Sequence, residues 1–492
     1  MRPKRVIYIL VDGLSSTFFN ELVNGGKMPC IEEYLINDGT YVRDCLSCFP
    51  ANTAPANLAH LTGTYTNRHG IPLIKYWRPD LGTYKDFTKS SLSAIEELND
   101  SISDDVKTIY EYFSDRTTAM HLINRGASDV YAGKSKSIFL YLYAKIFGWN
   151  QLHRLAIKTV LKRLASKNPS KVIAVYLPGP DAISHKLGPA SSEYRDNVKN
   201  LDANIRLLIE GGEGVQGLKG LNILKDTLVI FSSDHGEVEV KGICSLEDQL
   251  EELGIGFIAG KSRPEKIRKT SVLMALSGGI AFLNFRNPRN GLFELNASDL
   301  KKYPLNGHST DILKWLRSLK GVNNVYLREA SSTYRILGKE GSSRIFRKEE
   351  GEKAYYRYQI LEGKDPLGYD ENETTARMIE KGFFPAREWQ SATRFSKNLD
   401  IIDQIPRVYD CKDMKSTIIV TSLRNWSFKS HKGEHDNETN EIRRVPLIFS
   451  DMKIAAERVD PIRTVDVLPT VLDLLNVAYN KQAIDGVSLV QG

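Results

Sequence analysis

The feature that most constrains this chain is a set of apolar runs that end in aspartate or histidine. The run over 226–233 is followed directly by Asp234 and His235, and the run over 4–11 ends at Asp12. Near-continuous Val, Ile and Leu runs are typical of strands buried on both faces of a parallel sheet. Since ligands bind at the carboxyl ends of such strands, the pattern predicts an α/β protein with its functional site at that edge.

Two further segments repeat the pattern. The run over 171–180 leads to Asp181, with His185 four residues later, and His435 follows the run over 416–422. Alternating strand-like and helix-like segments favour a doubly wound, mostly parallel sheet sandwiched by helices.

Composition and charge narrow the classes of partner. The chain has 492 residues, of which 41% are hydrophobic and 26% charged, and a net charge of +7. Because Lys and Arg are spread along the chain, we expect no stable nucleic-acid binding. A mild positive charge suits a small anionic substrate.

The cysteines and the apolar runs bear on location. Five cysteines are an odd and sparse set for a disulfide scaffold, which favours a reducing compartment. Cys45 and Cys48 have CxxC spacing, but no second CxxC completes a zinc site, so buried thiols are the favoured interpretation. No signal peptide precedes the first predicted strand, and no run reaches the roughly 18 apolar residues of a membrane span. We therefore expect a cytoplasmic protein.

The chain divides into a discontinuous core and an insertion. Residues 1–251 and 416–492 have α/β character and form the predicted metal-dependent catalytic core. Residues 252–415 hold short alternating runs broken by Gly, Asn and Pro, and are predicted to form an inserted α+β cap domain over the site or one sheet edge. Residues 134–165 mix basic with large apolar side chains, which suits either peripheral membrane contact, helices packed on the sheet, or a lid.

The chemistry-bearing residues at the predicted strand ends form a metal-ligand set. Six of them are Asp12, Asp181, His185, Asp234, His235 and His435, and Thr53 adds a hydroxyl. Mixed carboxylate and imidazole ligands suit zinc, or manganese as second choice. This many ligands indicates two metals about 4 Å apart, as in phosphoryl-transfer sites.

The segment around Thr53 resembles a known family. Pro50-Ala-Asn-Thr53-Ala-Pro55, Thr62-Gly63 and His69-Gly70-Ile71 match the pattern of the alkaline phosphatase superfamily, in its type I phosphodiesterase/nucleotide pyrophosphatase branch. The resemblance implies an alkaline phosphatase-like fold and a hydrolase acting on phosphoric ester bonds. It further implies that Thr53 is both nucleophile and metal ligand.

The resemblance also divides the ligands between two metals. One would be held by Asp12, Thr53, Asp234 and His235. The other would be held by Asp181, His185 and His435. A sulfatase, the sibling class, would carry a cysteine at position 53 and an arginine at position 57, where this chain has Thr53 and Asn57.

Two departures from the branch pattern affect the site. The branch places an asparagine three residues after the threonine, where this chain has Ala56, so Asn57 is the candidate donor to a substrate oxygen. The alternative is that Asn57 points away, which would weaken oxyanion stabilisation or change the substrate class. The sequence after His435 is also unusual, and His431 is the alternative ligand. Tyr76 and Trp77 could stack on a base or sugar, or pack in the core.

The implied reaction is metal-dependent hydrolysis of phosphodiester or nucleotide pyrophosphate bonds through a phosphothreonine intermediate. Metal coordination activates the Thr53 hydroxyl, and the metals neutralise charge on the transferring group. A phosphomonoesterase or phosphonate hydrolase on the same site, and a catalytically silent binding protein, are the alternatives.

Overall fold

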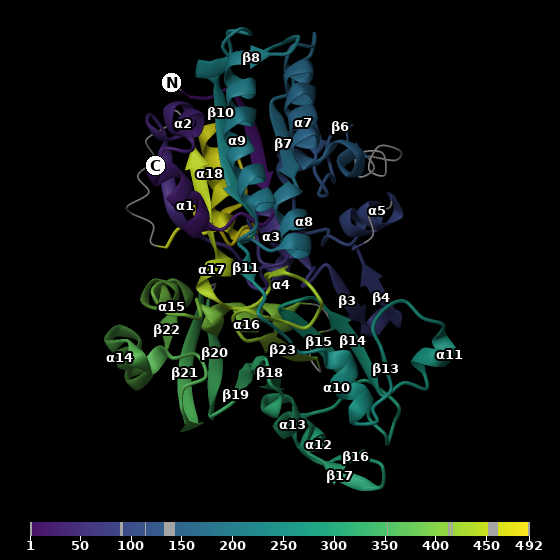
Figure 1. The fold of residues 1–492 in the computed structure, drawn as a ribbon. Helices are drawn as coiled ribbons and strands as arrows, with labels where there is room; N and C mark the ends of the chain where they lie inside the picture. Colours follow the sequence, from purple (N-terminus) through teal and green to yellow (C-terminus); the bar gives the residue numbers. More distant parts are fainter. Residues whose placement is uncertain are drawn as a thin grey trace.

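The computed structural model describes residues 2–88, 92–113, 115–131, 143–351, 353–411, 414, 417–450 and 461–490. These residues form two lobes, each built around one sheet, which meet in the middle of the molecule (Figure 1). Both ends of the chain lie on the lobe that holds the seven-stranded sheet.

The seven-stranded sheet is mostly parallel. Its order is β2 (Thr40–Leu46), β26 (Arg444–Phe449), β10 (Thr227–Ser233), β1 (Arg5–Val11), β7 (Val172–Leu177), β5 (Thr117–Met120) and β6 (Asp129–Val130). The strands from β10 to β6 pair in parallel, and β26 and β2 add an antiparallel edge. In the register of the central strands, Val6 lies between Leu228 and Val172.

Helices cover both faces of this sheet, which explains why its strands are apolar throughout. Alternate residues of β1 enter different cores, with Val6, Tyr8 and Leu10 in one and Ile7, Ile9 and Val11 in the other. The helices of the first face are α3 (Thr53–Thr62), α5 (Leu92–Asp100) and α18 (Val467–Leu474); those of the second are α1 (Ser16–Asn24), α2 (Pro29–Ile31), α7 (Trp149–Leu164) and α9 (Ser192–Glu210). The predicted α/β class and doubly wound architecture are confirmed.

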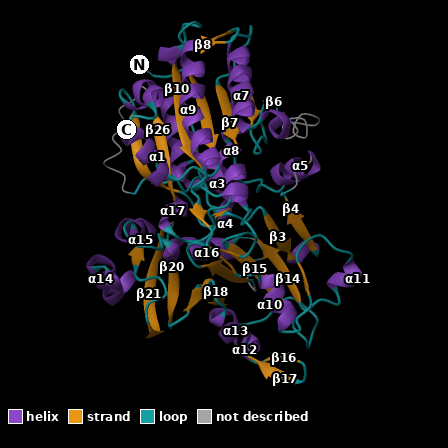
Figure 2. Cartoon of the chain, in the orientation of Figure 1, coloured by secondary structure: helices purple, strands orange, loops and turns teal. Residues whose placement is uncertain are grey.

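The second lobe is built on a nine-stranded, mainly antiparallel sheet (Figure 2). Its order is β13 (Phe257–Ile258), β14 (Val272–Leu276), β15 (Ile280–Phe285), β23 (Ile418–Ser422), β18 (Val322–Ala330), β19 (Thr333–Gly338), β20 (Gly341–Glu350), β21 (Lys353–Gly363) and β22 (Phe384–Pro385). One face packs on α10 (Leu246–Glu252), α12 (Ala297–Lys301) and α13 (Ile312–Ser318), and the other on α14 (Glu373–Lys381), α15 (Ala386–Thr393) and α16 (Ile401–Asp410).

One strand lies on the other side of the predicted domain boundary. The apolar run over 416–422 is predicted to belong to the core, but β23 pairs antiparallel with β15 and β18 in the second sheet. All five residues of β23 are buried. Because helices cover both faces of the second sheet as well, an apolar run fits its centre as well as it fits a parallel sheet.

The lobes share one hydrophobic core. A single cluster of buried side chains contains residues of β1 in the first sheet and of β15 and β19 in the second. The hairpin of β3 (Lys75–Arg78) and β4 (Thr83–Asp86) reaches into the second lobe, where the Tyr84 hydroxyl donates to the Ile258 carbonyl at 2.6 Å. The two lobes are therefore packed against each other rather than joined by a loose linker.

This hairpin decides between the two readings of its aromatic pair. Tyr76 is 1% and Trp77 5% exposed, and the Trp77 ring packs against Tyr84 and Phe293. Neither ring offers a face to a ligand, so the pair belongs to the core and does not stack on a base or sugar.

The segment over 134–165 is described in part. The apolar side of α7 is buried in the core of the first lobe through Ile157, Val160, Leu161 and Leu164. This helix therefore packs on the sheet, as one of the alternatives predicts. Residues 134–142 lie outside the described part of the chain, and membrane contact through them stays a prediction. Among the helices described, none is both long and apolar enough to cross a membrane.

Short elements complete the fold. Two-stranded ribbons pair β8 (Gly211–Gly212) with β9 (Val215–Gln216), β11 (Val238–Glu239) with β25 (Gly433–Glu434), β12 (Gly242–Ile243) with β24 (Trp426–Ser427), and β16 (Tyr303–Leu305) with β17 (His308–Thr310). Short helices are α4 (Thr66–His69), α8 (Gly179–Leu187), α11 (Pro264–Ile267) and α17 (Asn440–Arg443). All five cysteines are buried, and Cys45 and Cys48 are free thiols, which confirms their interpretation as buried thiols. The cytoplasmic location stays a prediction.

Candidate metal centre

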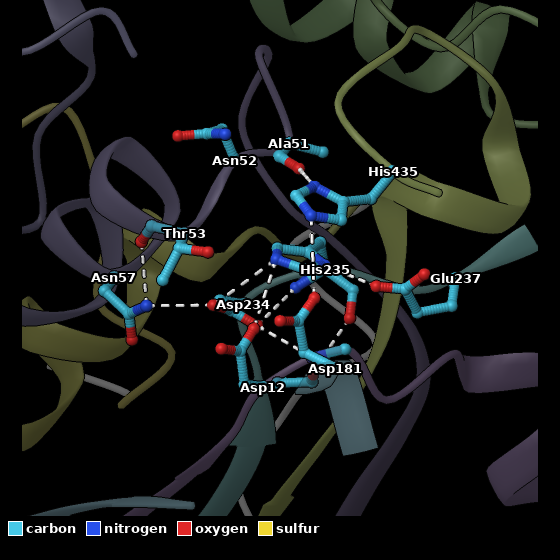
Figure 3. A network of polar contacts seen from close by, with 12 residues as sticks. Asp12, Ala51, Asn52, Thr53, Asn57, Asp181, Asp234, His235, Glu237 and His435 are labelled. Atoms are coloured by element: carbon cyan, nitrogen blue, oxygen red, sulfur yellow. Dashed lines mark hydrogen bonds and ion pairs between the residues drawn. The ribbon is translucent and has the colours of Figure 1, made fainter. Parts of the chain in front are cut away.

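Three neighbouring strands deliver the predicted ligands to one place between the lobes. Asp12 directly follows β1, and Asp234 directly follows β10. Asp181 and His185 lie on α8, which begins two residues after β7. Because β10, β1 and β7 are adjacent and parallel, their carboxyl ends bring these side chains together (Figure 3).

Asp12, Asp234 and His235 form the first ligand group. Their ligand atoms lie within 4.8 Å of one another, and all three residues are buried. His235 Nε2 is 3.2 Å from Asp12 Oδ1 and 3.6 Å from Asp234 Oδ2. Gly13 lets the chain after β1 come close to Asp181, because Gly13 has a φ of +70° and a Cβ added there would lie 3.0 Å from Asp181.

In the first group, two buried carboxylates would repel each other without a cation. Burial and the neighbouring Asp12 carboxylate raise the pKa of Asp234 to about 8. Burial alone would lower the pKa of His235, but the Asp234 and Asp12 carboxylates raise it to about 10. Buried like charges at this distance are unfavourable, and a divalent cation would relieve them.

Asp181, His185, His435 and Glu237 form the second ligand group, again with ligand atoms within 4.8 Å of one another. His185 Nε2 is 3.2 Å from Asp181 Oδ1, and His435 Nε2 is 3.6 Å from the same oxygen. The two Nε2 atoms are 3.3 Å apart. Burial alone would lower the pKa of His185, but Asp181 raises it to about 12.

The structure brings His435 into the second group and leaves His431 beside it. The His431 ring lies 4.3 Å from that of His185, centroid to centroid, and its side chain is 33% exposed. His431 Nδ1 faces Glu434 at 3.4 Å. His435, the first of the two predicted ligands, is thus the one whose Nε2 meets Asp181 and His185.

The three central histidines share one orientation. The Nδ1 atoms of His185, His235 and His435 each lie against a backbone carbonyl, of Gly433 at 3.0 Å, Gly236 at 3.3 Å and Ala51 at 3.1 Å. A carbonyl can only accept, so Nδ1 carries a hydrogen in each ring and Nε2 turns toward the cluster, where a metal would displace its proton and use the lone pair. Hydrogen bonds of this kind, from Nδ1 to a backbone carbonyl, fix the tautomer of histidines that bind metals through Nε2.

The buried atoms left without a hydrogen-bond partner test whether the residues fit metal ions. Among the described residues they include Asp12 Oδ1, Asp181 Oδ1, His235 Nε2 and Glu237 Oε1, all in the two groups. Buried polar atoms are normally satisfied, and these atoms are the ones that a cation would engage. The donor set of carboxylate oxygens and imidazole nitrogens therefore fits divalent metal ions.

Thr53 stands beside the first group at the N-terminus of α3. It is the first residue of that helix and 9% exposed. In Figure 3 its hydroxyl oxygen lies on the side that faces Asp234 and His235. The start of a helix carries partial positive charge and free backbone N–H groups, which favours an anionic group there.

Asn57 is placed differently from its predicted role. Its Nδ2 donates to the Thr53 carbonyl at 2.8 Å and to Asp234 Oδ2 at 2.9 Å, so both amide hydrogens are used. One helical turn separates residues 53 and 57, which puts Asn57 on the same side of α3 as Thr53 but deeper, where it is 1% exposed. Asn57 therefore holds the Asp234 carboxylate with the amide hydrogens that the prediction assigns to a substrate oxygen.

Three residues of the site escaped the sequence reading. His121 follows β5 directly, and its Nε2 lies 3.0 Å from Asn57 Oδ1 while its Nδ1 accepts from the Ile123 amide. Tyr176, within β7, donates its hydroxyl to Asp12 Oδ2. Glu237 lies only three residues after Asp234. His121 and Glu237 carry the same signal as the predicted ligands, a polar side chain just beyond a buried strand.

The second lobe supports the loop that carries His435. A Cβ added to Gly279 would lie 2.0 Å from the His435 carbonyl oxygen. Asp436 Oδ1 accepts from Asn52 Nδ2 at 2.8 Å, and the buried Glu438 accepts through Oε1 from Asn324 at 2.8 Å and Thr421 at 2.9 Å. The loop is thus fixed by both lobes, which accounts for its unusual sequence.

Comparison with known proteins finds relatives both by sequence and by structure. Residues 6–344 match the family described as Type I phosphodiesterase / nucleotide pyrophosphatase. Ectonucleotide pyrophosphatase/phosphodiesterase family member 1 of Rattus norvegicus is 28% identical over 238 residues, 48% of this chain and 24% of the relative. Bis(5'-adenosyl)-triphosphatase ENPP4 of Bos taurus is 25% identical over 236 residues, 48% of each. The chain thus matches between about a quarter and about half of these relatives' length.

Solved structures share the fold over nearly the whole chain. Murine ectonucleotide pyrophosphatase / phosphodiesterase 5 superposes with a TM-score of 0.56 at 12% sequence identity, covering 96% of this chain and 95% of the other. An inactive variant of the same murine protein, in complex with AMP, has a TM-score of 0.52 at 13% identity.

The fold and the two ligand groups define an alkaline phosphatase-like α/β protein with side chains that could hold metal ions. Because the family match spans more than half of the chain, the protein belongs to the type I phosphodiesterase/nucleotide pyrophosphatase family.

Proposed function

We propose that this protein hydrolyses phosphate esters, acting on phosphodiester or nucleotide pyrophosphate bonds at a site for two divalent metal ions. The observation that carries the proposal is the pair of adjacent ligand groups, toward which three histidine Nε2 atoms and unpaired carboxylate oxygens point. Two metals about 4 Å apart suit in-line displacement at phosphorus.

The proposed ligands follow the two groups. One metal would be held by Asp12, Thr53, Asp234 and His235, and the other by Asp181, His185 and His435. Zinc suits this mixture of imidazole and carboxylate, with manganese as the second choice. Bound metals would lower the pKa of a coordinated hydroxyl and neutralise charge on the phosphoryl oxygens.

The proposed reaction has two steps, and Thr53 is the residue that reacts. In the first step Thr53 Oγ1 attacks phosphorus, its proton passes to solvent, and the bond to the leaving group breaks. In the second step a water molecule attacks the phosphothreonine from the opposite side and restores the Thr53 hydroxyl. The N-terminus of α3 favours the anionic phosphoryl group, and Asn57 keeps Asp234 in place.

Nucleotides are the proposed substrate class. One relative is named for hydrolysis of a bis(5'-adenosyl) triphosphate, and a structural neighbour was solved with AMP. The positive net charge of the chain is compatible with such anions.

A pair of chromogenic assays tests the proposal. Bis(para-nitrophenyl) phosphate, a diester, and para-nitrophenyl phosphate, a monoester, are compared with zinc or manganese added. We expect faster turnover of the diester. Faster turnover of the monoester would assign a phosphomonoesterase or phosphonate hydrolase. No turnover of either, at full metal occupancy, would leave a catalytically silent binding protein.

A further inference from the structure

Glu237 is a buried carboxylate that the proposed reaction does not use. It lies between His235 and the short strand β11, and its side chain has no exposed surface. Figure 3 shows it on the far side of His235 from Thr53, close to Asp181 and His435. Its position within the centre calls for a partner of positive charge.

The two oxygens of Glu237 have different surroundings. Oε2 accepts a hydrogen bond of 2.9 Å from the hydroxyl of Ser184, the residue before His185 on α8. Oε1 has no hydrogen-bond partner among the described residues and lies 4.0 Å from His235 Nδ1. The hydrogen bond from Ser184 fixes the carboxylate, so that one oxygen is held and the other is left for a ligand.

The free oxygen belongs to the second ligand group. Glu237 offers a ligand atom within 4.8 Å of those offered by Asp181, His185 and His435. The Asp181 Oδ1 atom in this group is also buried without a hydrogen-bond partner. Two such oxygens beside two Nε2 atoms are a ligand set that closes around a single point. An unpaired buried carboxylate is costly, and a cation is what would compensate it.

We infer that Glu237 is the fourth protein ligand of the second metal position, an inference that rests on the proposed function. Two carboxylates and two neutral imidazoles would balance the charge of a divalent cation. Four protein ligands fill the tetrahedron that zinc adopts in closed sites, whereas a six-coordinate cation such as manganese would keep two positions open for substrate. Because a carboxylate oxygen is a ligand type that suits manganese, Glu237 would shift the metal preference of this position toward manganese.

The test measures metal binding rather than turnover. Glu237→Gln keeps the shape of the side chain and mimics a protonated carboxyl group, so it separates a metal ligand from a neutral hydrogen-bonding group. Glu239→Gln is the matched control, since Glu239 lies two residues away on β11 and is exposed. Metal content per chain is determined by elemental analysis, and affinities for zinc and manganese by calorimetry in chelator-buffered solution.

We expect the wild type and Glu239→Gln to bind two metals. Glu237→Gln should keep the first and bind the second at least about tenfold more weakly, with the larger loss for manganese. Two metals bound by Glu237→Gln at wild-type affinity would overturn the inference. A wild type that binds no metal would overturn the proposed function itself, so the two failures differ.

A second variant covers the case in which Glu237→Gln does not fold. Glu237→Asp keeps the charge but shortens the side chain, so it cannot accept from Ser184 and reach the metal position together. It should fold and show a weakened second metal; unchanged affinity in this variant would equally contradict the assignment.

Discussion

The Asn57 side-chain nitrogen donates a hydrogen bond of 2.9 Å to Asp234 Oδ2, the carboxylate that follows the central strand β10. The donor direction can be traced one residue further back. Burial lowers the pKa of His121 to about 3, and its Nδ1 accepts from the Ile123 amide, so Nε2 carries the hydrogen and donates to Asn57 Oδ1. A neutral histidine, an amide and a carboxylate therefore form one directed chain that ends at the first ligand group.

Removing this support should weaken the first metal. Asn57→Ala leaves Asp234 Oδ2 without its donor, and we expect about tenfold lower affinity for one of two metals. Calorimetric titration of metal into the metal-free protein measures it. Asn200→Ala on the exposed side of α9 is the control, and equal affinities in both variants would contradict the role of Asn57.

Loss of the Thr53 hydroxyl should separate chemistry from folding. Thr53→Ala keeps a good helix former at the start of α3, so we expect the fold and most metal binding to remain. Turnover of the phosphate diester should fall at least about a thousandfold, as expected when a nucleophile is removed. Thr88→Ala, at an exposed site after β4, is the control in the same assay. A near-normal rate in Thr53→Ala would remove it as nucleophile.

The contact between the lobes should be sensitive to one methyl group. A Cβ on residue 279 would lie 2.0 Å from the His435 carbonyl oxygen. Gly279→Ala should therefore lower the free energy of unfolding by about 1–3 kcal/mol and weaken the second metal. Gly256→Ala is the matched control, because nothing lies within 4 Å of its Cβ position. Denaturant titration compares the two, and equal stabilities would show that the loop moves freely.

The metal-free protein should lose stability as the pH rises from about 7 to 9. The pKa of Asp234 is raised to about 8, that of His435 to about 9 and that of His235 to about 10. The folded chain therefore holds more protons than the unfolded chain between about pH 7 and 9, and the free energy of unfolding falls with pH. Below this range the pKa values of the buried His60, His69, His121 and His153, which burial lowers, act in the opposite direction.

Metal binding displaces those protons, so metal should stabilise the protein more at about pH 9 than at about pH 7. Melting temperatures with and without zinc, at both values, check both statements. A metal-free protein that becomes more stable toward pH 9 would be the contrary result.

The residues of the site that can be predicted from the sequence are those that directly follow a buried strand. Asp12 and Asp234 lie directly at the ends of adjacent strands, and Asp181 with His185 lies on the helix after the third. These positions depend only on buried apolar runs and on the geometry of a parallel sheet, both of which are local in sequence.

Residues whose roles depend on contacts between distant segments could not be predicted. The sequence does not show which groups the Asn57 amide bonds. Its hydrogen bonds with His121 and Asp234 form only when these distant segments pack together. His435 is among the predicted ligands, but the apolar run that precedes it, β23, belongs to the second sheet and not to the predicted core. An apolar run does not reveal which sheet buries it. The pairing of Glu237 with Ser184 likewise exists only in three dimensions.

The double attachment of the His435 loop has a consequence for how this protein can change. Asp436 is held by Asn52 from the first lobe, and Glu438 by Asn324 and Thr421 from the second. The inserted lobe therefore helps to position the loop of the candidate metal centre, and it cannot serve as an exchangeable specificity module. Grafting the lobe from a relative would replace the side chains that hold the His435 loop, so a new substrate preference would have to arise within the existing lobe.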